Sequence, residues 1–213
     1  MWCTVRNLAF ATLVASTTVP QPVQGQTVPI SQLTTTADAP LLTTDRTLLA
    51  SLKRIWQGSP LWREAVAAVR KTGRRVLVAT PIDVSTSRDQ DVVGFDPRLL
   101  AEAIPVFDES SRIPLVVIVV NLRMVQEAHD ARLSVPRDFE ADLDRILVHE
   151  IYGHAVPYLL AGNLSGRCPD PQQGESASDA CAIRRENAVR AELGLGRRAD
   201  DGLYSLALAL GTR

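Results

Sequence analysis

Two of the three histidines in this chain lie five residues apart, and a glutamate directly follows the first: His149, Glu150 and His154. Catalytic zinc sites use these groups, with the histidines as ligands and the glutamate as general base. The usual spacing is His-Glu-x-x-His, so this chain carries one extra residue. Residues four apart on an α-helix lie about 40° apart around the axis, whereas residues five apart lie about 140° apart. A regular helix would therefore keep the two imidazoles from meeting at one metal ion.

The residues around His154 allow the helix to widen by one residue, as in a π-helical turn. Gly153 lies in the inserted turn, and glycine tolerates unusual backbone angles. Pro157 has no N–H, so it cannot bond the carbonyl of Gly153 four residues earlier. We therefore predict a π-type bulge that brings His149 and His154 together.

The residues before the motif predict a long helix that starts at Pro136 and carries Glu150 on its apolar stripe. The apolar residues recur at helical spacing: Phe139, Leu143, Ile146 and Leu147. A carboxylate in such a stripe is costly to bury unless a cation or a hydrogen-bond network receives it. A helix that served only for packing would carry Leu or Ala at this position.

A second group of acids follows the motif, with twenty residues between His154 and Glu175. That length is enough for a turn and a returning helix. Glu175 and Asp179 are four residues apart and share a helix face, which Glu186 continues. Periodicity alone does not choose among these three acids as the third metal ligand. Glu186 has a ready partner in Arg190, which favours one of the other two.

Both motifs resemble those of known zinc peptidases. The first is similar to the His-Glu-x-x-Gly-His motif of the dipeptidyl peptidase III family, a branch of the Glu-ligated zinc peptidases called gluzincins. Residues 175–179 resemble the Glu-x-x-Ser-Asp element of thermolysin-like gluzincins. That resemblance implies that Glu175 is the third zinc ligand and that Asp179 orients a zinc-bound histidine, His149. Residues 186–195 resemble the C-terminal part of small zinc-protease domains in bacterial effectors and Rhs-type toxins, which keep the plain His-Glu-x-x-His spacing.

The N-terminus predicts a secretory signal at residues 1–25. Arg6 is its only charge, and the apolar run from Leu8 to Ala15 is too short to span a bilayer. A buried N-terminal helix is the alternative. Residues 26–44 are rich in Thr, Pro and Ala and predict a flexible leader. We therefore expect a secreted or periplasmic protein without a stable membrane span, whose domain occupies residues 45–213.

Cysteine usage agrees with export. Cys3 leaves with the signal, so only Cys168 and Cys181 remain. Two cysteines in an exported chain favour a disulfide. Two free thiols and a metal-binding pair are the alternatives, and both rank below the disulfide.

The rest of the chain predicts one α+β domain of ordinary size, from 213 residues that are 46% hydrophobic. The expected elements are helices at 44–58, 59–73 and 96–103 and strands at 75–80 and 113–122. Thr44 would cap the first helix, and Trp56 and Trp62 would anchor the core between the first two. His129 is expected to be a lone surface histidine. The formal net charge of −1 gives no reason to expect a nucleic-acid partner.

These patterns together predict a zincin-like α+β domain that hydrolyses a peptide bond of a peptide or protein substrate. One Zn²⁺ would be held by His149, His154 and Glu175, with Glu150 as general base. Tyr204 is a candidate oxyanion donor. A zinc amidase acting on cell-wall peptides and a non-catalytic exported module remain alternatives, since the same ligands serve any amide and a motif does not guarantee activity.

Overall fold

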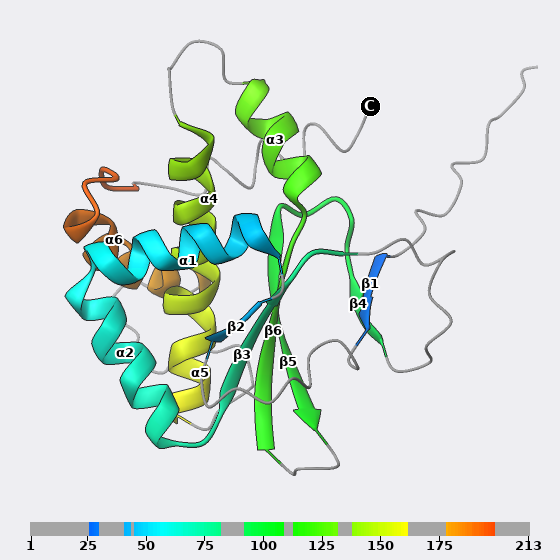
Figure 1. Ribbon diagram of the computed structural model, residues 1–213. Helices are drawn as coiled ribbons and strands as arrows, with labels where there is room; N and C mark the ends of the chain where they lie inside the picture. Colours follow the sequence, from blue (N-terminus) through cyan, green and yellow to red (C-terminus); the bar gives the residue numbers. More distant parts are fainter. Residues whose placement is uncertain are drawn as a thin grey trace, which may run out of the picture.

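The computed structural model describes residues 26–29, 41–43, 45–81, 92–108, 113–131, 138–161 and 178–198. In this part of the chain the helices cover one face of a four-stranded sheet (Figure 1). The sheet has the order β2 (Leu41–Leu42), β3 (Arg75–Ala79), β6 (Ile113–Val120), β5 (Ala101–Asp108). Strands β2, β3 and β6 are parallel neighbours, and β5 runs antiparallel to β6 at the edge. A second, two-stranded sheet pairs β1 (Gln26–Pro29) with β4 (Val92–Phe95).

The described helices fall into four groups. Helices α1 (Arg46–Gly58) and α2 (Pro60–Lys71) lie between β2 and β3, and α3 (Leu122–Asp130) follows β6. One continuous helix comes next, composed of α4 (Phe139–Leu147), η3 (Val148–Ala155) and α5 (Val156–Ala161). Helix α6 (Ser178–Glu192) packs against η3. The α+β class predicted from the sequence is therefore confirmed.

The first two helices begin at side-chain caps. The carboxylate of Asp45 accepts hydrogen bonds from the backbone N–H groups of Thr47 and Leu48, so Asp45 caps α1 in place of the expected Thr44. Ser59 accepts from the N–H of Trp62, and Pro60 occupies the first turn of α2, as expected. Gly73 then adopts a φ of 70°, which ends the helix where the sequence predicts.

The core lies on both faces of the sheet because successive strand residues point to opposite sides. Val76 and Val78 belong to the larger cluster, beneath the helices. Leu77 belongs to a smaller cluster on the other face, which Phe95 of β4 joins. Trp62 is fully buried, as predicted, but Trp56 is 44% exposed, so its prediction as a core anchor is wrong.

Three further expectations differ from the structure. The helix predicted at 96–103 is wrong: Asp96 accepts from the backbone N–H of Arg98 in a turn, and β5 begins at Ala101. Pairing with β6 along the whole of β5 outweighs the local helix signal of Asp96 and the following proline. Strands β1 and β2 lie within the stretch predicted as a flexible leader. His129 is half-buried, and its Nδ1 lies 3.0 Å from Oδ2 of Asp142.

Candidate metal centre

The helix that carries the motif widens at the predicted place. Residues Val148–Ala155 form a π-helix, η3, which continues from α4 and leads into α5. At its end the N–H of Val156 bonds the carbonyl of Ile151, five residues earlier, where an α-helix would use the residue four earlier. The π-type bulge predicted from the spacing is therefore confirmed.

The π-helical turn brings the two imidazoles together. Nε2 of His149 and Nε2 of His154 are 3.2 Å apart, and the rings meet edge to face at 85° with centroids 4.8 Å apart. Two nitrogen ligands bound tetrahedrally to one zinc ion, with bonds of about 2.0–2.1 Å, would be separated by about 3.3 Å. The separation in this chain therefore fits a shared zinc ion, and it equally fits a hydrogen bond between the rings.

The carboxylate of the motif is almost fully enclosed. Glu150 is 3% exposed and His149 is 2% exposed, whereas His154 is half-buried. Strand β5 packs against η3, and its Glu102 lies close enough to Glu150 to feel its charge. Burial raises the pKa of Glu102, and the negative charges of Glu150 and Asp96 raise it further, although a backbone hydrogen bond at Asp96 opposes them. The edge of the sheet therefore borders the motif.

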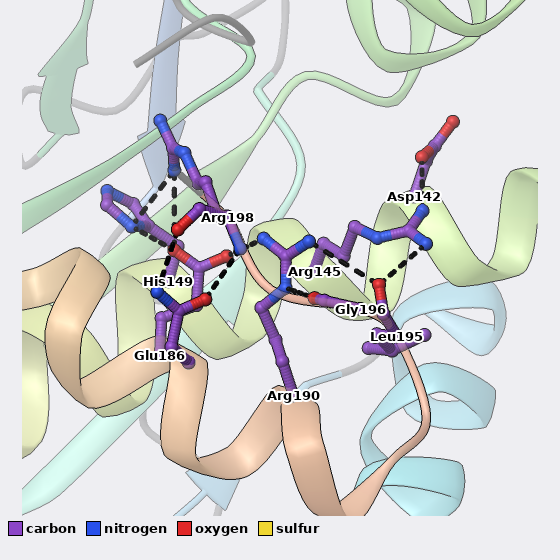
Figure 2. Close-up of polar contacts among 9 residues, drawn as sticks. Asp142, Arg145, His149, Glu186, Arg190, Leu195, Gly196 and Arg198 are labelled. Carbon is purple, nitrogen blue, oxygen red and sulfur yellow. Dashed lines mark hydrogen bonds and ion pairs between the residues drawn. The ribbon is translucent and has the colours of Figure 1, made fainter. Parts of the chain in front are cut away.

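Glu186 on α6 fixes the orientation of the first histidine. Its Oε2 lies 2.9 Å from Nδ1 of His149 (Figure 2). A carboxylate acceptor there holds the proton on Nδ1 and turns the lone pair of Nε2 toward His154. This role was expected of Asp179, whose side chain lies outside the described part of the chain, so the role of Asp179 stays a prediction. Glu186 is the acid that contacts Nδ1 of His149 in the described residues.

Two arginines keep the buried Glu186 charged. Nη1 of Arg190 lies 2.6 Å from its Oε1, and Nη1 of Arg198 lies 3.3 Å from its Oε2. Burial alone would raise the pKa of Glu186, but the hydrogen bonds and charges of His149 and Arg190 outweigh it, so the pKa is lowered. The pairing of Glu186 with Arg190, predicted from the four-residue spacing, is therefore confirmed.

Arg190 ties α6 to the segment that follows it, and Arg145 ties that segment to α4. Nε of Arg190 donates to the carbonyl of Gly196, and an Nη atom of Arg145 donates to that of Leu195 (Figure 2). Arg145 also contacts Asp142 at 2.7 Å. The support of His149 is therefore a network that spans two helices and a connecting segment.

Gly153 allows α6 to approach the π-helix closely. A Cβ at position 153 would lie 2.9 Å from Cβ of Ala182 and 3.1 Å from its carbonyl oxygen. The φ angle of Gly153 is not positive, so the expectation that this glycine adopts an unusual backbone angle is wrong. Glycine is needed at position 153 because Ala182 leaves no room for a side chain. The carbonyl of Gly153 accepts a hydrogen bond of 3.0 Å from Nη1 of Arg185.

Several predicted residues lie outside the described part of the chain, among them Glu175, Cys168 and Tyr204. Cys181 is buried and disulfide-bonded, but its pairing with Cys168 stays a prediction. The described residues contain no group of three His, Cys, Asp or Glu side chains able to hold a metal ion. What they bring together is the pair of imidazoles of His149 and His154.

Comparison with known proteins adds no relative: no family model, curated protein or solved structure matches this chain. Among the described helices, none is both long enough and apolar enough to cross a membrane.

Proposed function

We propose that this chain is an exported zinc-dependent peptidase with a gluzincin-type site in a zincin-like α+β domain. The observation that carries the proposal is the convergence of His149 and His154, with Nε2 atoms 3.2 Å apart and Glu150 between them on a π-helix. Turns of the π-helical kind are rare and occur frequently at functional sites, which supports a functional role for this one. The signal-like residues 1–25 support export.

His149 and His154 would bind the ion through Nε2, and Glu175 is the third ligand that the sequence favours. Bound zinc polarises the scissile carbonyl and makes water a better nucleophile at neutral pH. Glu150 accepts the proton that water loses as its oxygen bonds the carbonyl carbon. It then gives that proton to the departing amine as the C–N bond breaks. Burial of Glu150 supports this role, since a buried carboxylate is costly unless a cation or hydrogen bonds receive it, and a bound zinc ion would be such a cation.

The sheet edge supports a peptide as the substrate. Strand β5 lies beside η3 and pairs on one side with β6, and it is an edge strand of the described four-stranded sheet. Edge strands present backbone N–H and C=O groups to an extended chain, which can add as a further strand. An extended substrate on β5 would pass the Glu150 carboxylate, which lies within electrostatic range of Glu102 on that strand.

The proposal is tested on the chain from Gln26 onward, by measuring bound zinc and the cleavage of a panel of polypeptides and peptidoglycan fragments. We expect one zinc per chain and cleavage of polypeptides. Glu150→Gln should keep the metal and lose nearly all hydrolysis, because an amide cannot accept the proton. Glu127→Gln, at an exposed position of α3, is the matched control and should behave as wild type. Cleavage of only peptidoglycan fragments would favour an amidase, and zinc without any hydrolysis would favour a non-catalytic module.

A further inference from the structure

We infer that Arg185 is a positioning residue that holds η3 in its π-helical form and thereby brings the two motif histidines together. The link from this geometry to zinc binding rests on the proposed function, whereas the effect on the helix itself does not. Arg185 lies on α6, and its Nη1 donates to a backbone carbonyl of the motif helix, that of Gly153.

The carbonyl of Gly153 lies where the helix is one backbone N–H short, because residue 157 is proline. Nη1 of Arg185 lies 3.0 Å from this oxygen and supplies the hydrogen bond. An unsatisfied buried carbonyl costs free energy comparable to a lost hydrogen bond. The guanidinium therefore stabilises the turn at which the helix departs from regular spacing.

Helix α6 is built to place this guanidinium. Ala182 packs against Gly153 so closely that a Cβ would not fit, which fixes the distance between the two helices. Arg185 and Glu186 follow Ala182 by three and four residues and therefore share its helix face. Arg185 reaches the backbone of η3, and Glu186 reaches the imidazole of His149. One face of α6 thus fixes both the helix register and the ring orientation.

Burial of Arg185 also argues for a specific role. Burial lowers the pKa of Arg185, and the nearby Tyr152 opposes this shift. A half-buried guanidinium is costly unless its N–H groups are used. Without Arg185, the turn at Gly153 would lose this hydrogen bond, and α6 would no longer fix the approach of His154 to His149. The metal site would then be weakened although no ligand had changed.

Zinc affinity, measured by competition with a chelator, tests this inference on the chain from Gln26 onward. Arg185→Gln should lower the affinity by roughly 10–100-fold, the usual cost of losing support outside the ligands. Arg185→Lys keeps a cationic donor and should recover part of the loss. The matched control is Arg74→Gln, because Arg74 donates to the carbonyl of Leu159 on the same continuous helix, beyond the π-helical turn. It should lower stability but leave zinc affinity and the visible spectrum of bound Co²⁺ unchanged.

Crystal structures of the metal-free wild type and Arg185→Gln provide a readout that does not depend on zinc. We expect the Nε2 atoms of His149 and His154 to separate beyond 3.2 Å in the variant only. An unchanged π-helix and separation in Arg185→Gln would overturn the inference, as would an equal loss of zinc affinity in Arg74→Gln. A wild-type protein that binds no zinc would instead overturn the proposed function, and the crystal structures would still decide the role of Arg185.

Discussion

Replacing Glu186 by glutamine tests whether a buried charge behind His149 sets the properties of the metal site. Glutamine has the same shape but no charge, so packing is preserved. The Glu186 carboxylate is 1% exposed and is contacted by His149 at 2.9 Å, Arg190 at 2.6 Å and Arg198 at 3.3 Å. The substitution removes the negative charge that these three contacts share.

Two effects of different size follow. Removing one partner of a buried ion pair costs about 3–5 kcal/mol, because the remaining charge stays out of water. Replacing the charged acceptor of a ligand's N–H by a neutral amide lowers metal affinity by up to about 10–100-fold, which corresponds to about 1.4–2.7 kcal/mol. We therefore expect Glu186→Gln to lose more stability in the metal-free protein than binding free energy for zinc.

Urea denaturation of the metal-free protein and chelator competition for zinc measure the two effects separately. Asp144→Asn is the matched control. Like Glu186, Asp144 is a buried carboxylate, but it lies on α4 and contacts Arg54 at 2.7 Å and Ser51. It should lower stability and leave zinc affinity unchanged. Wild-type zinc affinity in Glu186→Gln, or an equal loss in Asp144→Asn, would refute the reasoning.

Two further predictions concern the helix contact and the sheet edge. Gly153→Ala should lower the free energy of unfolding by about 1–3 kcal/mol through overpacking and should weaken zinc binding, because α6 must move away from η3. Gly94→Ala, where an added Cβ meets nothing within 4 Å, is its control in urea denaturation, and equal losses would contradict the prediction. The pKa of Glu102 is raised, so folding favours the neutral form of its carboxyl group. The stability that this preference contributes is present below the ordinary pKa of 4.5 and is lost as pH rises. Glu102→Gln should therefore gain stability relative to wild type between pH 4 and pH 7, and denaturation curves that show no such gain would disprove it.

The π-helical turn was predictable because it follows from helix geometry. Histidines five residues apart can meet only if the helix gains a residue in that turn, and Pro157 marks where its bonding is interrupted. The ends of α2 were predictable for a similar reason, since Ser59 caps the helix with its own side chain and Pro60 and Gly73 act through their own backbones. Features of this kind depend on only a few neighbouring residues.

The partner of His149 could not be chosen in the same way. The sequence offers three acids on one helix face, namely Glu175, Asp179 and Glu186. Which of them reaches Nδ1 depends on how α6 packs against η3. That packing is set by the absence of a side chain at Gly153, a feature that the sequence suggested for a different reason. The strand at 101–108 was missed because its partner, β6, is supplied by residues further along the chain.

The inserted residue and the docking of α6 are best understood as one arrangement. In the His-Glu-x-x-His spacing, the two histidines lie on one face of a regular α-helix. That helix alone then sets their geometry. In this chain the convergence needs a π-helical turn, and Arg185 of α6 donates to the carbonyl of Gly153 in that turn. The same face of α6 that supplies Arg185 also supplies Glu186 to His149. Metal binding should therefore be coupled to the docking of α6 more strongly than it would be with the plain spacing, since neither the register of η3 nor the ring orientation is secured by the motif helix alone.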